Sequence, residues 1–268
     1  MPLPLLNTIA RQAFVAFVVA IPLTAQLPAT TTHVVPSVPG ARRTLPITVD
    51  GKLDEGAWAA ATPITELRQT RPTEGAAATL ATEIRILYDD DALYIGARMT
   101  EPMGAAGIRA PLARRDQLLA ANGNNGSFNS LTTDKIAVVL DPYHNHLDEI
   151  WFEINPAGVR GDQYNGDPSW DPVWEGATQV TAEGWTAEIR IPYSQLRFSS
   201  QPVQTWGLQL WRFVDRLNEQ DQWSFRRRDE SGGPAYYGHL ERSEEHTSEL
   251  QSPTTLFPST TLFRSQDD

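Results

Sequence analysis

Apolar and polar residues alternate with a period of two along much of the chain. In residues 83–88 (EIRILY) and 93–99 (LYIGARM) one face of each run is apolar, and three aspartates at 89–91 separate the runs. Successive side chains of a strand point to opposite faces, so this alternation predicts strands that are buried on one face. The short polar link between the two runs predicts a β-hairpin.

The same pattern predicts strands along the rest of the chain. Five further segments are strand candidates, at residues 134–141, 149–155, 185–191, 206–216 and 222–226. The continuous apolar run at 134–141 predicts a central strand, and the polar residues at 218–221 predict a turn. Helical patterns are few and short, at residues 53–60, 109–121 and 194–196. Many short strands joined by such loops predict an all-β fold, namely a β-sandwich of jelly-roll type with a few short helices.

The first 43 residues predict export rather than folded structure. Arg11 precedes an apolar run at 13–23, and small residues follow at 24 and 25, which is the order found in secretory signal peptides. The run is shorter than the roughly 20 residues that a membrane-spanning helix needs. We therefore expect a signal peptide at 1–25 and a flexible leader at 26–43, with the mature protein in the periplasm or outer membrane of a Gram-negative-type bacterium.

The last 27 residues do not continue the strand pattern. The strings at 242–252 (RSEEHTSELQS) and 255–265 resemble the translation of sequencing-adaptor DNA. We expect residues 242–268 to be a non-native, unstructured tail. One domain at 44–241 then remains, a length that suits a single β-sandwich.

Composition narrows the function further. The formal net charge of −11 argues against nucleic-acid binding, which needs a basic surface. The sequence has no cysteine, which excludes disulfides and thiolate metal sites. It also carries none of the common hydrolase, metalloprotease, P-loop or dinucleotide-binding signatures.

A series of sequence blocks resembles the family 9 carbohydrate-binding modules. The opening block is VDGKLDE at 49–55, followed by Trp58. Further blocks follow in the family's order, at 87–102, 134–145, 155–163, 170–177, 184–198 and 206–219. The later blocks are similar to a subgroup in which the module precedes an outer-membrane β-barrel. The resemblance covers residues 45–241 and implies a β-sandwich, an envelope location and a native chain that continues into a barrel.

The chain departs from that family at its sugar clamp. Sugar-binding members hold a sugar end between two Trp side chains. At the first of these places this chain has Leu131 and Thr132, and in the last loop it has Tyr236 and Tyr237. Sugar binding by the family's own geometry is therefore not implied for this chain.

Alternation also places polar and aromatic side chains together on single strand faces. If those faces line one concave sheet, they form a groove with two Trp stacking platforms among hydrogen-bonding groups, which suits a sugar. The ligand-binding residues predicted in this way are Trp151, Glu153, Glu188, Arg190, Gln209 and Trp211. The alternative is ordinary structure, with both Trp side chains under a covering loop and Glu188 paired with Arg190.

The loop at 161–175 is a candidate calcium site. Asp162, Asp167 and Asp171 supply hard oxygen ligands near two glycines, which calcium prefers. The alternative is that these residues cap turns in their own loop. A weaker metal hypothesis joins the pair His144 and His146 to nearby aspartates.

Three functions follow from these observations. The first is an exported, non-catalytic module that binds a polysaccharide or a cell-envelope glycan and serves carbohydrate catabolism. The second is a structural or gating domain of a β-barrel protein that binds no sugar. The third is a part of a glycoside hydrolase system, in which Glu153 and Glu188 would be the two carboxylates that O-glycosyl hydrolysis requires.

Overall fold

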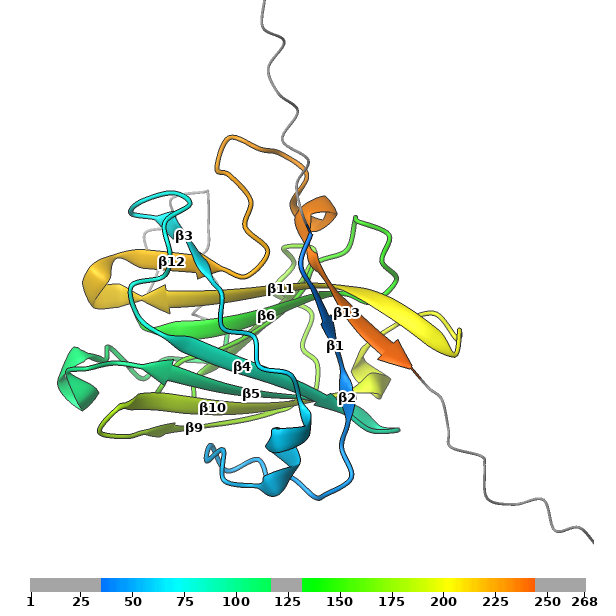
Figure 1. The fold of residues 1–268 in the computed structure, drawn as a ribbon, viewed down its shortest axis with the longest axis horizontal. Helices are drawn as coiled ribbons and strands as arrows, with labels where there is room; N and C mark the ends of the chain where they lie inside the picture. Colours follow the sequence, from blue (N-terminus) through cyan, green and yellow to red (C-terminus); the bar gives the residue numbers. More distant parts are fainter. Residues whose placement is uncertain (1–34, 117–131, 244–268) are drawn as a thin grey trace, which may run out of the picture. The chain divides into compact units, whose positions relative to one another are not determined.

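Two β-sheets packed face to face make up the described part of the chain (Figure 1). The structure is a computed structural model and describes residues 35–116 and 132–243. These residues all belong to one compact unit of the chain. No helix among them is long and apolar enough to cross a membrane.

The larger sheet has the strand order β1-β13-β11-β6-β7-β8, and β12 links β11 to β3. Its strands are β1 (Ser37–Pro39), β3 (Arg68–Arg71), β6 (Lys135–Asp141), β7 (Ile150–Ile154), β8 (Arg160–Tyr164), β11 (Val203–Val214), β12 (Glu219–Gln222) and β13 (Gly238–Ser243). All pairs are antiparallel except β1 with β13. The continuous apolar strand β6 lies inside this sheet, as its sequence predicts.

The smaller sheet has the order β2-β4-β5-β10-β9. Its strands are β2 (Ala41–Arg42), β4 (Thr82–Tyr88), β5 (Ala92–Thr100), β9 (Glu175–Val180) and β10 (Gly184–Pro192). The predicted hairpin is β4–β5, in register from Thr82 opposite Met99 to Tyr88 opposite Leu93. Short 3₁₀ helices connect the strands, at η1 (Gly56–Ala60), η2 (Gly104–Gly107), η4 (Tyr193–Gln195), η5 (Asp215–Leu217) and η6 (Gly233–Tyr236).

The core lies between the two sheets. Alternate residues of β6, β7 and β11 meet those of β4, β5 and β10, and the largest fully buried rings are Trp174 and Trp206. Burying such apolar side chains is the main favourable contribution to folding, at about 25 cal/mol per Å². The predicted all-β sandwich is therefore confirmed.

The edges of the domain differ from the sequence prediction. Within the predicted leader, β1 pairs with β13 and β2 pairs with β4, so the fold begins before residue 44. At the other end β13 runs to Ser243, and the guanidinium of Arg242 lies 4.5 Å from the ring of Tyr193 and 4.7 Å from that of Trp206. The fold thus extends past residue 241. The predicted signal peptide and the residues from 244 onward lie outside the described residues.

Three local predictions were also wrong. The expected turn at 218–221 is mostly strand β12, because the chain turns earlier, at η5 and the left-handed Asn218 that follows it. The strand expected at 222–226 accordingly ends at Gln222. The helix expected at 109–121 is absent from its described part, residues 109–116.

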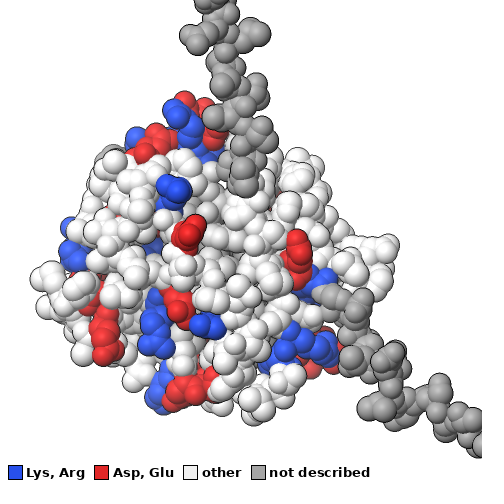
Figure 2. All heavy atoms as spheres, viewed as in Figure 1, with Lys and Arg blue, Asp and Glu red and all other residues white. Residues whose placement is uncertain are grey.

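Charged side chains are spread over the surface. Figure 2 shows Lys and Arg interspersed with Asp and Glu over one face. The net charge of −11 is therefore not gathered into one patch on that face.

Candidate functional site

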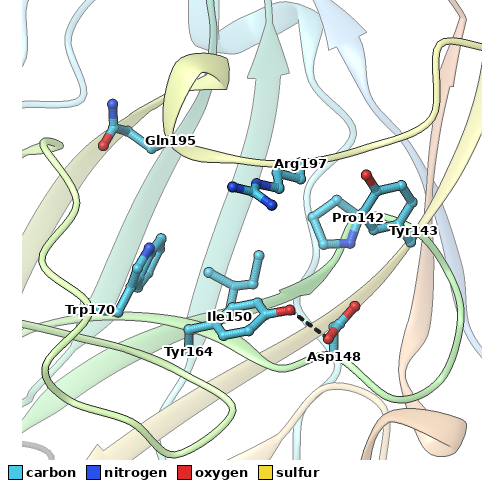
Figure 3. A pocket seen from close by; sticks show the side chains of 8 residues that line it. All are labelled: Pro142, Tyr143, Asp148, Ile150, Tyr164, Trp170, Gln195 and Arg197. Carbon is cyan, nitrogen blue, oxygen red and sulfur yellow. Dashed lines mark hydrogen bonds between the residues drawn. The ribbon is translucent and has the colours of Figure 1, made fainter.

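An open cavity of about 320 Å³ lies beside the larger sheet, where four loops meet (Figure 3). The link from β6 to β7, the end of β8, the link from β8 to β9 and the segment after β10 each contribute side chains. The lining residues are Pro142, Tyr143, Asp148, Ile150, Tyr164, Trp170, Gln195 and Arg197. The volume is close to the lower end of the range of about 300–1,000 Å³ for small-molecule sites.

Three aromatic rings line this cavity. Tyr143 is 51% exposed and Tyr164 is 39% exposed, so both keep free ring surface. Trp170 is half-buried, with its ring 5.8 Å from Phe152 of the core and 6.2 Å from Tyr164. The buried side chain of Ile150 lies between them. Aromatic faces that are partly exposed and held by the core can stack on another flat apolar surface.

The carboxylate of Asp148 is fixed on one side of the cavity. It accepts hydrogen bonds from the Tyr164 hydroxyl at 2.8 Å, from Asn145 Nδ2 at 2.7 Å and from Asn165 Nδ2 at 3.1 Å. Burial alone would raise the pKa of Asp148, but these three donors outweigh it and hold the pKa below its usual value. Asp148 is therefore an ionised acceptor whose oxygens are already engaged.

Gln195 and Arg197 lie on the other side of the cavity, above Ile150 in Figure 3. Gln195 Oε1 accepts a hydrogen bond from the backbone N–H of Val173 at 2.9 Å, which fixes the amide. Arg197 is exposed. The hydrogen bond to Asp148 raises the pKa of the Tyr164 hydroxyl, and the positive charge of Arg197 acts in the opposite direction. The cavity thus joins aromatic faces to directional hydrogen-bonding groups, the combination that recognises a sugar ring.

Four of the six predicted ligand residues do come together, but elsewhere. Trp151 and Glu153 on β7 and Gln209 and Trp211 on β11 share the outer face of the larger sheet, on either side of β6. The rings of Trp151 and Trp211 stack at 6.1 Å with an interplanar angle of 28°.

These four side chains are packed rather than open. Trp151 is only 9% exposed, and Glu153 is fully buried in an ion pair with Lys135 Nζ at 2.9 Å. Gln209 donates to the carbonyl of Ser224 at 2.6 Å. In this arrangement the aromatic pair contributes to packing and offers little free ring surface.

The other two predicted residues belong to the opposite sheet. Glu188 and Arg190 lie on β10, so their outer face points away from that of β7 and β11. Arg190 pairs with Glu175 at 2.8 Å and donates to the Tyr94 hydroxyl at 3.2 Å. The six residues therefore do not share one groove, because alternation assigns a residue to a strand face but not to a sheet.

Glu188 instead fastens the opening sequence block to the smaller sheet. Its carboxylate accepts from the backbone N–H of Asp50 at 2.9 Å and of Gly51 at 2.8 Å, and from Trp58 Nε1 at 3.2 Å. Burial raises the pKa of Glu188 to about 7. The hydrogen bonds from the two backbone amides lower this pKa, and the negative charge of nearby Glu55 raises it further. The block VDGKLDE and its Trp thus have a structural role here.

The predicted calcium ligands do not form one set. Arg115 lies between two of them, with Nη2 2.6 Å from Asp162 and 3.0 Å from Asp171. Asp167 instead caps its own turn by accepting from the backbone N–H of Ser169 at 2.9 Å. Within residues 35–116 and 132–243, no group of three or more acidic, His or Cys side chains is placed to hold a metal ion. A guanidinium therefore occupies the position predicted for a calcium ion.

The predicted histidine pair gains a third member from a distant strand. The His144 ring lies 4.6 Å from that of His146 and 4.8 Å from that of His239 on β13. Asp141 does not complete a ligand set, because its carboxylate accepts from the backbone N–H groups of Asn145 and His146 at 3.2 and 2.7 Å. Burial, with the neighbouring imidazoles, lowers the pKa of His144.

The cavity residues could not be identified from the sequence, and neither could the contacts of the residues at the two clamp positions. Tyr143 and Trp170 lie in loops and Tyr164 ends strand β8, so no periodicity marks a shared face; aromatic residues in and beside loops were the available signal. Of the residues at the clamp positions, Tyr237 is buried and donates its hydroxyl to Glu149 at 2.8 Å, while Leu131 lies outside the described residues.

Facing sheets with a loop-built cavity at their border define a β-sandwich module that carries a candidate ligand site. A family model for the carbohydrate family 9 binding domain-like proteins matches residues 49–239. The chain belongs to this family. No curated protein sequence matches it.

Solved structures share the fold at low sequence identity. A family 9 carbohydrate-binding module from Caldicellulosiruptor kristjanssonii, in complex with cellotriose, matches with a TM-score of 0.55 and 14% identity over 81% of this chain and 98% of that one. A family 9 module from the same organism in complex with glucose gives a TM-score of 0.53 at 14% identity, over 79% of this chain and 99% of that one. A putative carbohydrate-binding protein from Bacteroides uniformis gives 0.59 at 13%, over 78% and 99%.

Proposed function

We propose that this protein is a carbohydrate-binding module that holds a saccharide in the cavity of Figure 3. The observation that carries the proposal is the convergence of three aromatic rings with Gln195 and Arg197 around one open space. Sugar C–H faces stack on aromatic rings, while sugar hydroxyls need donors and acceptors that are already positioned. Family membership and two relatives solved with cellotriose and with glucose support the same class of ligand.

The proposed partner is a polysaccharide or a glycan of the cell envelope, and the proposed role is binding without catalysis. Glu153 and Glu188, the carboxylates considered for hydrolysis, lie on different sheets and are each engaged in structural contacts. Retaining and inverting glycosidases place their two carboxylates across one scissile bond. The placement of this pair favours binding over hydrolysis.

Calorimetry of the purified chain against soluble oligosaccharides tests the proposal. Tyr143→Ala removes an exposed ring from the cavity, and Leu147→Ala removes a more exposed apolar side chain of the same loop that does not line it. Truncating a stacking ring is expected to weaken binding about 5- to 30-fold, which corresponds to about 1–2 kcal/mol. Equal binding by both variants would place the saccharide elsewhere.

We also propose that the protein is exported to the periplasm or outer membrane, with its native chain continuing into a β-barrel. The support is the sequence at 1–25 and the resemblance of the later blocks to barrel-linked modules. Mass analysis of the protein from its host is expected to show a start near Gln26. A retained Met1 in the soluble cytoplasm would contradict export.

A further inference from the structure

We propose that the ligand of this cavity is an acidic saccharide, a sugar ring that carries a carboxylate, with Arg197 as the residue that recognises the charge. The inference rests on the proposed function, because it assumes that the cavity of Figure 3 binds a sugar. It adds the chemical class of that sugar, which differs from the neutral cellotriose and glucose of the solved relatives.

Arg197 is the positively charged residue of the cavity. Arg197 lines the cavity, and within the described residues its guanidinium makes no hydrogen bond or ion pair with another side chain or with the backbone. The guanidinium therefore brings a positive charge to the cavity that no carboxylate of the described residues pairs with.

The carboxylate that lines the cavity, that of Asp148, does not pair with Arg197. Asp148 accepts hydrogen bonds from Tyr164, Asn145 and Asn165 with both of its oxygens. These three donors fix the carboxylate on its own side of the cavity. The guanidinium of Arg197 stays available on the opposite side (Figure 3).

Two other arginines of the described residues show what a structural role looks like in this chain. Arg115 pairs with Asp162 at 2.6 Å, and Arg190 pairs with Glu175 at 2.8 Å. In a chain with a net charge of −11, acidic partners are plentiful. An arginine that points into a cavity without one is placed for a charge from outside the protein.

The shape of the cavity fits one carboxylated sugar ring. A guanidinium binds a carboxylate through two parallel N–H···O bonds, a geometry that a hydroxyl cannot match. Tyr143, Tyr164 and Trp170 offer ring faces to the C–H face of the sugar. The Gln195 amide accepts from the Val173 N–H and donates to Ser194 Oγ, which leaves one of its N–H groups for a sugar hydroxyl. Uronic acids of polysaccharides and muramic acid of the cell wall share this chemistry.

Two pairs of matched sugars test the inference by calorimetry at pH 7. Methyl glucuronide and methyl glucoside differ only at C6, and N-acetylmuramic acid differs from N-acetylglucosamine only in its lactyl group. Each acid is expected to bind at least tenfold more tightly than its neutral partner, with an advantage that shrinks at high salt. The better of the two acids identifies the source of the carboxylate.

Arg197→Gln supplies the residue-level test, with Arg98→Gln as a control that removes one exposed positive charge from the opposite sheet. Arg197→Gln is expected to weaken the acid about 10- to 100-fold and the neutral sugar less than threefold, while Arg98→Gln changes neither. Equal affinity for acid and neutral sugars, or equal losses for both, would overturn the inference and leave the proposed function standing. If no sugar binds, both fail.

Discussion

Replacing Glu188 by alanine distinguishes a structural carboxylate from a ligand-binding one. Glu188 is fully buried and accepts hydrogen bonds from the backbone of Asp50 and Gly51 and from the indole of Trp58. The variant removes the acceptor and leaves these donors in place. Water can reach the partly buried amide of Asp50, but the amide of Gly51 and the indole of Trp58 lose their partner inside the fold.

The size of the effect follows from those donors. A buried donor left without an acceptor costs about 1–3 kcal/mol, so two of them give a loss of about 2–4 kcal/mol in the free energy of unfolding. In a domain of this size each kcal/mol lowers the melting temperature by about 2–4 °C. We expect Glu188→Ala to melt about 4–16 °C below the wild type.

Chemical denaturation and calorimetry measure both consequences. Glu183→Ala, which removes an exposed carboxylate directly before β10, is the matched control and should unfold like the wild type. Because neither Glu188 nor its hydrogen-bond partners line the cavity, Glu188→Ala should bind saccharide normally below its melting temperature. Unchanged stability together with lost binding would refute this reasoning and return Glu188 to the ligand site.

The pH dependence of stability gives a second test of the role of Glu188. The folded-state pKa of Glu188 is raised to about 7 from an ordinary value of 4.5, so the native state holds a proton that the unfolded state has released. Its contribution to stability is full below the ordinary value and is lost as the pH rises to about 7. The gap in stability between wild type and Glu188→Ala should therefore narrow over that interval.

Two further predictions concern the loops. The pKa of His144 is lowered by burial and by His146 and His239, so the unfolded state binds the proton more readily, and stability should fall as the pH drops through the ordinary value of 6.5. Melting curves from pH 7 to pH 5 should show this fall, and His144→Gln should reduce it; an unchanged slope would argue against it. Arg115→Met strands the buried carboxylate of Asp162 and should cost about 3 kcal/mol in denaturant unfolding. Calcium should not raise the melting temperature of the wild type, and a clear rise would contradict the role given to Arg115.

The β-sandwich could be predicted from the sequence because strands are recognisable by the alternation of apolar and polar residues with a period of two. The hairpin of β4 and β5 and the central strand β6 follow directly from that pattern. Strands β1 and β2 were missed because three and two residues are too few to show a period. β12 was missed because its polar residues resemble a turn, although Asp221 and Gln222 are buried.

The candidate site was harder to predict for a different physical reason. Alternation correctly placed Trp151 beside Trp211, but it could not show that Glu188 belongs to the other sheet. The cavity is formed by loops that are distant in sequence, so Tyr143 and Arg197 become neighbours only when the sheets have paired. Tertiary contacts of that kind leave no local signature.

A crystal structure of the protein soaked with methyl glucuronide tests the central claim most directly. The account predicts a sugar ring in the cavity against Tyr143, Tyr164 and Trp170, with its carboxylate on the guanidinium of Arg197. A sugar bound instead on the outer face of the larger sheet, over the ring of Trp151, would contradict it.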